Sequence, residues 1–548
     1  MSGPNDPTTA FASARQPVLL RATAWLTPRW CRIFLFLLLL AGVVSRLHYL
    51  NSSPPIDLAG DEAHYWDWSR QLQLSYYSKG PLVALIIRAS TELFGSQMPA
   101  VRYPAIILAV LTSLCTYWLT RYLLKSERLA LGVVVLTHLV PIFVVGSMLM
   151  TIDPPFYFCF AAATCLAAKA LLENRRWPWP LIGVLVGIGF LAKYAALLWF
   201  VGLFAFLLWE PTARRWLRSP WPYLAIIVSL LFTAPVVVWN WQNDFVTFKH
   251  VARQTGATDE AGFDLRNFLE FVGGQAGVLG PGLAAAMIGG VILATRRNAD
   301  RSLRYLLCIG GTFFALTLVS ALRAKAQLNW PAPAYFTGMI LAGYFISTRL
   351  HLPTQWKTWR WVIYPTIALG LVVAPAAHDM TRFYPAMAWV HARFSSEPFS
   401  PRNVDPSTRL MGFRELGLHL GGLLKQMQPG AFVVAENYQV AGSAAFYIPG
   451  QPKTYYAGSY FADPERRARY CQYDLWPDRS LEPTNLQLLG KDALYIGYIT
   501  EDFKAAFESV ERLADLRIER NGVFVRRFIV YRCVGFKGLP RPRDKTDF

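Results

Sequence analysis

The stretch DLAGDEAHYWDWSRQLQLSYYSKGP, residues 57–81, is a polar and aromatic segment between two apolar ones. It contains the adjacent acids Asp61 and Glu62, and it ends in Lys79 beside a Gly-Pro pair. Polar loops between apolar segments are typical of proteins that cross a membrane several times. We expect this segment to be the first extracytoplasmic loop and to carry half of an active site.

The composition of the chain also indicates a membrane protein. Of its 548 residues, 54% are hydrophobic and 16% are charged, whereas soluble chains carry about 25% charged residues. The net charge is +19. Basic residues on cytoplasmic loops and contacts to membrane lipids explain this charge, so no nucleic-acid partner is expected. The seven cysteines contain no CxxC motif, and a disulfide between Cys471 and Cys533 is left open.

Apolar runs along the chain predict a polytopic α-helical membrane protein with about eleven transmembrane helices, and with thirteen as the upper count. The runs lie at 33–50, 101–120, 129–150, 155–172, 179–192, 195–209, 221–239, 272–294, 304–322, 331–347 and 361–377. Every second connection is rich in Lys and Arg. By the positive-inside rule those connections face the cytoplasm, so the first loop and the C-terminal part face outside.

The pattern divides the chain into three predicted parts. We expect a disordered cytoplasmic tail at 1–29, a transmembrane domain at 30–377 with the first periplasmic loop at 51–99, and a soluble periplasmic α/β domain at 378–548. Short interfacial helices are expected in the loop at 62–72, with Asp61 as N-cap, and at 82–94. In the last part, the residue pattern predicts strands at 431–435, 493–499 and 523–534, and helices at 411–427 and 501–514.

Several ionisable residues are candidates for chemistry on the outer face. Asp61 and Glu62 suit either a base with an orienting group or the start of a helix, and their spacing does not choose between these roles. Lys79 suits either a lipid phosphate or a lysine that snorkels to the interface. Positive charge at outer span ends needs a partner or an anionic ligand, and three more cations have that position: Lys193, Arg323 and Lys325.

A second group of residues offers contacts to a sugar. Aromatic rings provide stacking surfaces, but they are also the usual residues of the membrane's aromatic belt, so both interpretations stay open. The candidates are Tyr76, Tyr77, Asp153, Tyr194, Trp239, Asn240 and Trp241. For His250, in the segment that follows, a structural role is favoured.

Six segments of the chain resemble a known family. GDEAHYW (60–66) and YYSKGPLVALIIR (76–88), followed by VRYPA (101–105), resemble the first loop of the membrane glycosyltransferases of the C-type (GT-C) fold. The resemblance is to the branch that holds the dolichyl-phosphate-mannose protein mannosyltransferases and the bacterial aminoarabinose lipid A transferases. Further segments are similar to the bacterial members: FLAKYAAL (190–197), WNWQNDFVTF (239–248) and RAKAQLNWPAPAY (323–335).

This resemblance implies a function. A bacterial member of the family is an inverting glycosyltransferase in the inner membrane, with its active site and C-terminal domain in the periplasm. Its donor is a sugar on a polyprenyl phosphate such as undecaprenyl phosphate, and its acceptor is lipid A or lipopolysaccharide, another envelope glycan or a protein. Asp61 would be the base or the acceptor-orienting group, with Glu62 as support. The donor phosphate would be held by Lys79, Lys193, Arg323 and Lys325.

One departure from the family pattern keeps the sugar open. The aminoarabinose transferases have Glu-Lys-Pro where this chain has Ser78-Lys79-Gly80-Pro81. A neutral hexose, galactosamine or galacturonic acid is therefore equally open, and a divalent metal stays possible. A transporter or flippase of lipid-linked sugars and a non-catalytic envelope scaffold are the alternative functions.

Overall fold

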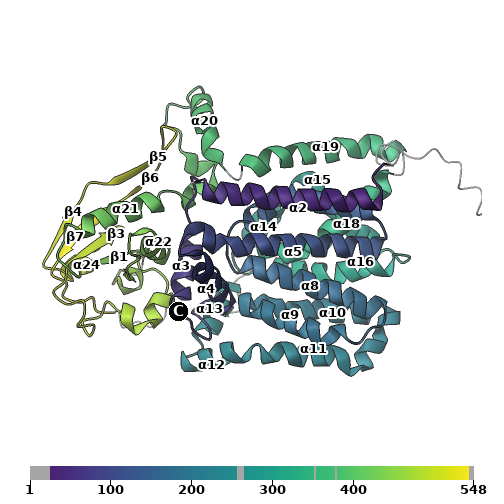
Figure 1. Cartoon of the computed structure of the whole chain (residues 1–548), viewed down its shortest axis with the longest axis horizontal. Helices are drawn as coiled ribbons and strands as arrows, with labels where there is room; N and C mark the ends of the chain where they lie inside the picture. Colours follow the sequence, from purple (N-terminus) through teal and green to yellow (C-terminus); the bar gives the residue numbers. More distant parts are fainter. Residues whose placement is uncertain are drawn as a thin grey trace, which may run out of the picture.

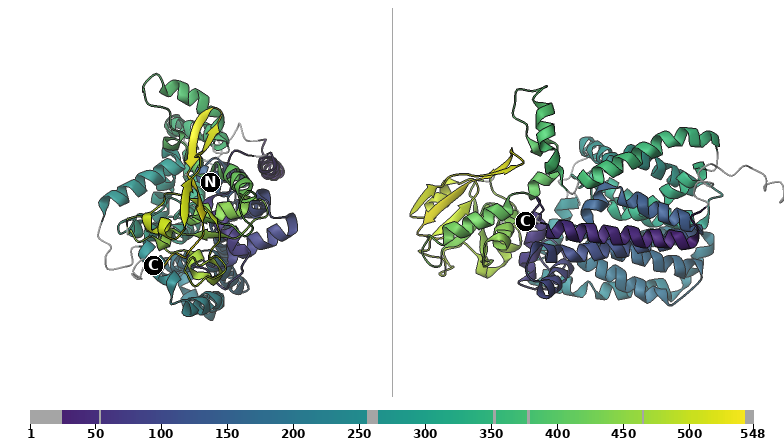
Figure 2. Two further views of the ribbon diagram at one scale, coloured as in Figure 1. Left: turned by 90° about the vertical axis from the view of Figure 1, so that its left-hand side faces the viewer. Right: turned by 45° about the horizontal axis from the view of Figure 1, so that its top comes forward.

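The structure is a computed structural model of the full chain. It describes residues 25–52, 54–255, 264–350, 353–376, 379–463 and 465–541. The predicted disordered tail lies outside the described residues as far as residue 24, and the first described helix already begins at Pro28. Figure 1 shows a bundle of helices with a smaller, strand-containing part at one end, and the views in Figure 2 agree.

The helices of the bundle coincide with the predicted apolar runs, each run forming one helix or a consecutive pair. A helix satisfies its own backbone hydrogen bonds, which is what an apolar surrounding requires. The bundle contains α2 (Pro28–Asn51), α5 (Met98–Leu124), α6 (Glu127–His138), α7 (Pro141–Gly146), α8 (Asp153–Leu172), α9 (Pro178–Ala192), α10 (Leu198–Trp209), α11 (Pro220–Leu231), α12 (Ala234–Gln242), α14 (Leu265–Leu279), α15 (Pro281–Thr295), α16 (Arg301–Leu306), α17 (Thr312–Ala321), α18 (Ala332–Leu350) and α19 (Pro353–Ala376).

The number of membrane spans is bounded by helix length. Within the described part of the chain, four helices are long and apolar enough to cross a membrane: α2, α5, α8 and the continuous helix Arg301–Ala321. Three bent pairs of helices raise this number to seven if each pair is one span. Helices such as α9, with 15 residues, are short for an upright span of about 20. The total of about eleven spans therefore stays a prediction.

The predicted single run at 272–294 is wrong in its geometry. It is divided between α14 and α15, which meet at 104°. Gly280, between them, has φ +78°, and Pro281 lacks the amide hydrogen that would continue the first helix. Apolar residues continue on both sides of this bend between α14 and α15, so the sequence pattern did not reveal it.

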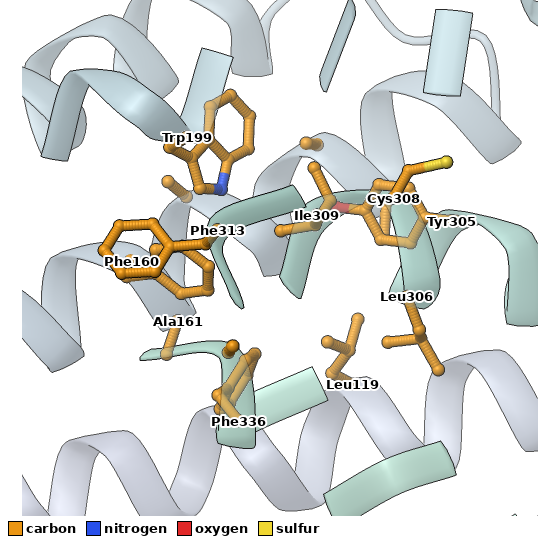
Figure 3. Packing of buried hydrophobic residues seen from close by; sticks show 14 of the residues in the cluster. Leu119, Phe160, Ala161, Trp199, Tyr305, Leu306, Cys308, Ile309, Phe313 and Phe336 are labelled. Carbon is orange, nitrogen blue, oxygen red and sulfur yellow. The ribbon is translucent and has the colours of Figure 1, made fainter. Parts of the chain in front are cut away.

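Close helix contacts hold the bundle together. Figure 3 shows Phe160 and Phe313 packed against each other, with Trp199 and Tyr305 nearby. The Trp199 indole donates to the Thr164 hydroxyl at 3.0 Å, and the Tyr305 hydroxyl donates to the Thr164 carbonyl at 2.6 Å. Paired polar groups and closely packed side chains are the main sources of helix association inside a membrane.

The first loop forms two helices, α3 (Gly60–Ser69) and α4 (Leu82–Phe94), close to the predicted ranges. The N-cap of α3 is Ala59, so the prediction of Asp61 as N-cap is wrong. Glu62, at the third position of the helix, binds this N-cap residue instead, because its carboxylate accepts the Ala59 amide hydrogen at 2.9 Å. Apart from Asp61, every residue of α3 is buried, whereas α4 keeps exposed apolar side chains such as Leu93.

The strand-containing part, the C-terminal domain, is a mixed sheet with short helices. Its strands are β1 (Phe432–Ala435), β2 (Thr454–Tyr456), β3 (Ala493–Ile496), β4 (Ser509–Arg512) and β7 (Val530–Val534), in the order β2-β1-β3-β7-β4, with a separate hairpin of β5 (Leu516–Arg520) and β6 (Val523–Phe528). The first three strands in that order are parallel, and the other two pair antiparallel. The helices are α20 (Tyr384–His391), α21 (Phe413–Leu424), α22 (Tyr438–Tyr447), α23 (Gln472–Leu475) and α24 (Glu501–Ala505).

Two predictions for this domain are wrong. The expected strand at 523–534 is two strands, β6 and β7, which pair with different partners. The expected helix at 501–514 ends at Ala505, and β4 follows it. Both errors have one cause: the choice of partner strand decides these segments, and the periodicity of each segment does not contain that choice.

The two faces of the sheet belong to different hydrophobic cores. Val433 and Leu494 point into a core that also contains Trp66 and Trp68 of α3, so the first loop and the C-terminal domain fold around shared apolar side chains. The alternate residues, with Cys533, form a separate core on the other face. Cys471 lies in the first core, and both cysteines are free, so a disulfide between them does not form in this structure.

Candidate active site

A cavity of about 350 Å³ lies where the first loop, the end of the helix bundle and the C-terminal domain meet. Figure 1 shows α3 and α4 in this position, between the bundle and the strands. We call two groups of its lining residues the membrane-side wall and the domain wall. The membrane-side wall comprises Asp61, His64, Tyr77, Lys79, Asp153 and Lys193; the domain wall comprises Tyr438, Gln439, Arg469 and Gln472.

Asp61 connects the two walls. Its Oδ1 accepts hydrogen bonds from the Gln439 side-chain amide at 3.0 Å and from the Tyr438 hydroxyl at 3.2 Å. These donors lie in the first turn of α22, and Asp61 lies in the first turn of α3, so the positive ends of two helix dipoles face the carboxylate. The helices approach this closely at Gly60, where a Cβ would stand 2.3 Å from the Gln439 Cβ.

Glu62, the neighbour of Asp61, is turned away from the cavity. It is fully buried in an ion pair with the fully buried Arg102, at 2.7 Å, and it accepts the Met150 amide hydrogen at 2.8 Å. Arg102 also donates to the Asp57 carbonyl at 2.7 Å. The adjacent acids therefore differ in their surroundings: Asp61 faces open space, and Glu62 joins α3 to α5.

Lys79 enters the cavity from a tight turn. The Tyr76 amide donates to the Lys79 carbonyl at 3.1 Å, and Gly80 lies against the Leu191 carbonyl so closely that a Cβ would be 2.2 Å from its oxygen. Within the described residues, no carboxylate lies within 4.0 Å of the Lys79 ammonium. Burial, together with the positive charge of Lys193, lowers the pKa of Lys79 to about 8. The site thus holds a desolvated cation beside a second cation.

Lys193 lies at the break between α9 and α10, in an extended conformation. Its ammonium pairs with Asp153 Oδ1 at 2.9 Å, and the Asn329 amide donates to the other oxygen of that carboxylate at 2.7 Å. The predicted cation and the predicted acid are therefore brought together at the cavity, where they neutralise each other.

The other predicted cations are not at the cavity. Arg323 and Lys325 are exposed and do not line it. The same stretch contributes Gln327, Asn329 and Trp330 to the lining instead. Binding of the donor phosphate by Arg323 and Lys325 stays a prediction.

The predicted sugar contacts divide in the same way. Tyr77 lines the cavity, and its buried hydroxyl has no hydrogen-bond partner among the described residues. Burial raises the pKa of Tyr77 to about 12, so this hydroxyl stays protonated. Tyr76 is stacked on Trp68 at 4.3 Å, away from the cavity.

The remaining aromatic and amide candidates have structural contacts. The Trp239 indole donates to the Gln73 side chain at 3.1 Å, and the Asn240 side chain accepts the Thr247 amide hydrogen at 3.1 Å. The Tyr194 hydroxyl bonds with the Ser75 hydroxyl at 3.3 Å. Trp241 is 73% exposed. None of these candidates lines the described cavity.

Sequence reasoning missed several lining residues. His64 is buried beside Tyr438 and Tyr473, and its Nδ1 has no hydrogen-bond partner in the described part of the chain. Burial and nearby arginines lower the pKa of His64 to about 3, so it is neutral. His250, expected to be structural, also lines the cavity and packs on Tyr77 at 4.9 Å. The histidine in GDEAHYW was the available signal for His64.

The domain wall was missed altogether. Arg469 donates to the Tyr438 hydroxyl at 2.8 Å, and its guanidinium has no carboxylate within 4.0 Å among the described residues. The Gln472 side chain accepts the Tyr77 amide hydrogen at 2.7 Å. No group of three His, Cys, Asp or Glu side chains in the described ranges could hold a metal ion.

Comparisons with known proteins agree with this architecture. Residues 78–239 match the family model described as dolichyl-phosphate-mannose-protein mannosyltransferase. The crystal structure of ArnT from Cupriavidus metallidurans bound to undecaprenyl phosphate aligns with a TM-score of 0.62 at 16% identity, over 93% of this chain and 98% of that one. The apo structure of the same protein gives a TM-score of 0.57 at 15% identity, with the same coverage. The chain has the GT-C fold, and its similarities lie with the bacterial members of that superfamily.

Two curated relatives are similar in sequence. Lipid A galacturonosyltransferase RgtD of Rhizobium johnstonii is 33% identical over 295 residues, which cover 52% of this chain and 60% of the relative. The undecaprenyl phosphate-alpha-4-amino-4-deoxy-L-arabinose arabinosyl transferase of Edwardsiella ictaluri is 30% identical over 219 residues, which cover 35% and 39%. The chain thus spans less than two thirds of the length of either relative.

Proposed function

We propose that this protein transfers a sugar from a polyprenyl phosphate to a lipid-linked acceptor such as lipid A. The observation that carries the proposal is the joint presence of Asp61 and Lys79 in one cavity at the end of an apolar helix bundle. The transfer needs a group that receives a proton and a cation for a lipid phosphate, and these two residues meet both needs. The names of the two curated relatives and of the ArnT structure support this class of reaction.

The reaction follows from the chemistry of the two ends of the cavity. An acceptor oxygen attacks C1 of the sugar, the bond from C1 to the phosphate oxygen breaks, and polyprenyl phosphate leaves. Asp61 receives the proton of an acceptor hydroxyl, and the hydrogen bonds from Gln439 and Tyr438 keep one carboxylate oxygen in place. Lys79 neutralises the phosphate, which is stable once released and needs little acid assistance.

Lys193 has a different role in this proposal, because its charge is already balanced by Asp153. Within the membrane-side wall this pairing leaves Lys79 as the cation without a carboxylate partner among the described residues. Binding of an anionic phosphate would raise the pKa of Lys79 again and hold its proton.

The orientation of the protein is part of the proposal. The connections rich in Arg and Lys, such as the one with Arg296 and Arg297, alternate along the chain with those that build the cavity. By the positive-inside rule the cavity faces the periplasm of a bacterium, and the protein lies in its inner membrane. Donor and acceptor would then both be lipids that reach the site from the outer leaflet.

The test uses the purified chain in lipid vesicles with polyprenyl-phosphate sugars and lipid A. We expect mass spectrometry to show lipid A that has gained one sugar residue, and we expect Asp61→Asn to reduce product formation by about 10²–10⁴-fold. The exposed Asp463→Asn variant is the matched control. Donor that changes leaflet while no acceptor gains a sugar would support a flippase and overturn the proposal.

A further inference from the structure

The short helix α20 follows the last helix of the bundle, α19, and leads into the C-terminal domain. One side of α20 is well packed. Tyr384 is fully buried in a cluster with Met411 and Val525, and its hydroxyl donates to the Asp405 carboxylate. Because Val525 belongs to β6, this packing fixes α20 to the C-terminal domain.

Another side of α20 is apolar but exposed. Large apolar side chains recur on it at the spacing of one helix face, and Phe394, just beyond the helix, is 86% exposed. Soluble proteins rarely expose several large apolar side chains next to one another, so this stripe needs a partner. We call it the α20 stripe, and it comprises Phe383, Trp389, Val390 and Phe394.

The depth of α20 in the fold identifies that partner. The membrane-spanning candidate α2 has 24 residues and is about 36 Å long at about 1.5 Å per residue, which exceeds the roughly 30 Å of a bilayer's hydrocarbon core. Its last turn therefore lies at the membrane interface. Tyr49, in that turn, packs against the cluster that contains Tyr384. This contact holds α20 at the depth of the lipid headgroups.

The direction of α20 agrees with this depth. Figure 1 shows α20 across the direction of α2 and α19, at the end of the bundle that carries the first loop and the C-terminal domain, and Figure 2 agrees. A helix that lies across the bundle axis is parallel to the plane of the membrane. The end of α19 also exposes Leu371 and Val372, so lipid-facing apolar surface precedes the α20 stripe along the chain.

The charges beside the stripe suit lipid headgroups. The Arg393 guanidinium lies 3.7 Å from the centroid of the Trp389 ring, and Arg382, which pairs with Asp379 at 2.9 Å, is 80% exposed. Helices that lie in the membrane interface combine Trp, Phe and Leu on the side of the acyl chains with Arg and Lys at the level of the phosphates. The composition of this segment therefore matches a lipid surface.

We propose that α20 is a membrane-binding surface. It lies in the headgroup layer of the leaflet on the cavity side, with the α20 stripe among the acyl chains and Arg393 at the lipid phosphates. Because α20 is packed against β6, its insertion holds the C-terminal domain against the bilayer. The inference requires that the bundle lies in a membrane, and it does not depend on the transfer of a sugar.

The test places one nitroxide label at Phe394→Cys in the full chain, in vesicles of phosphatidylcholine and phosphatidylglycerol. The native cysteines are buried or half-buried, so the new one reacts first. Power-saturation electron paramagnetic resonance compares collisions with oxygen, which concentrates in the bilayer, and with a nickel chelate, which stays in water. We expect the ratio of oxygen to nickel accessibility to be at least tenfold higher than at Leu486→Cys.

Leu486 is the matched control because it is 77% exposed on the same domain and lies beside Leu488, which belongs to the core on the far face of the sheet. If the label at Phe394→Cys meets the nickel chelate as often as the label at Leu486→Cys, α20 lies in water and the inference is wrong. A second copy of the chain on the stripe would shield the label from both reagents and broaden its spectrum through a nearby label. Broadening that disappears on dilution with unlabelled chain, together with low oxygen access, would also overturn the inference.

Hydrogen exchange gives a readout without a label. In the same vesicles, the double variant Trp389→Asp/Phe394→Asp should raise the amide exchange rates of α20 at least tenfold, because charged side chains withdraw the helix from the acyl chains. Leu486→Asp should leave these rates as in the wild-type chain, and unchanged exchange in β3 shows that the domain stays folded. Equal exchange of α20 in the double variant and the wild-type chain would mean that the bilayer does not cover the stripe, and it would contradict the inference.

Discussion

The membrane-side wall and the domain wall of the cavity are built on different principles. The membrane-side wall places charges against a bundle of apolar helices. Lys193 pairs with Asp153, whereas Asp61 and Lys79 have no ion-pair partner among the described residues. The domain wall consists mainly of neutral hydrogen-bonding groups, and its one cation, Arg469, bonds to a tyrosine. In the proposed reaction, the membrane-side wall therefore supplies the charged groups, and the domain wall orients them.

The walls are also held in place differently. The membrane-side wall depends on ion pairs: the part-buried Lys193–Asp153 pair in its lining and the fully buried Glu62–Arg102 pair behind it. In a buried pair the loss of one partner leaves an uncompensated charge. The domain wall stands on a hydrophobic core that α3 shares with the sheet. Substitutions that remove a charge should therefore have large effects, and substitutions in the domain wall should have smaller, graded ones.

The largest effect is expected for Glu62→Gln, which leaves Arg102 charged and fully buried. Breaking a buried pair in this way costs about 3–5 kcal/mol of stability. We expect a much lower apparent melting temperature in detergent. Asp61→Asn is the control on the same helical turn, because Asp61 pairs with no cation and should melt close to wild type. Equal melting temperatures for both variants would contradict the division of roles between the two acids.

A loss of activity without a loss of stability is expected for Lys79→Gln. In the proposed reaction Lys79 faces the donor phosphate, and removal of such an electrostatic group costs about 10²–10³-fold in rate, or roughly 2.7–4 kcal/mol. The measurement is kcat/KM for sugar transfer in vesicles. Lys325→Gln is the matched control, because Lys325 is exposed and lies outside the cavity lining. If Lys325→Gln reduces activity as much as Lys79→Gln, the exposed stretch must also contact the donor.

The two walls explain what could be predicted for the site. A charge stands out in an apolar sequence, so the positions of Asp61, Lys79 and Lys193 made them candidates, and the structure places all three at the cavity. Tyr438 and Arg469 lie in a soluble domain, where polar residues are ordinary, and no local pattern separated them from their neighbours. Only the approach of α22 to α3 brings them to the cavity.

The fold shows the same limit. Apolar runs predicted the helices of the bundle well, because lipid-facing helices need long hydrophobic segments. The division of 523–534 into two strands depends on the pairing of β7 with β3, which lies far away in the sequence. The corner at Gly280 has a local cause, the Gly280-Pro281 pair, but the apolar pattern on both sides of it did not reveal the bend. Arg323 and Lys325 were selected by the same charge rule as Lys193, yet they lie outside the cavity lining.

The pH dependence of kcat/KM tests how the membrane-side wall tunes Lys79. The pKa of Lys79 is lowered to about 8 by burial and by Lys193, so its protonated form is lost as the pH rises through about 8. The proposed reaction needs that protonated form to bind the donor phosphate. We expect kcat/KM to fall on that side. Lys193→Gln removes the neighbouring positive charge and leaves Asp153 unpaired, and both changes raise the pKa of Lys79. The alkaline limb of the pH profile should therefore move to higher pH. If the limb does not move, it does not report the titration of Lys79.

The smallest effect is expected in the domain wall, for Gln439→Ala. This variant removes one of the two hydrogen bonds to Asp61 Oδ1 and leaves the one from Tyr438. A hydrogen bond to a charged group at a partly exposed site contributes about 1–2 kcal/mol, so we expect kcat to fall roughly tenfold. KM for the donor should stay the same, because Gln439 faces the acceptor side of the reaction. Gln428→Ala, exposed on the same domain, is the control. An equal fall in kcat for both variants would mean that the domain wall acts through folding of the whole domain. A rise in KM without a change in kcat would mean that Gln439 contacts the donor, and it would contradict a role of Gln439 in orienting Asp61.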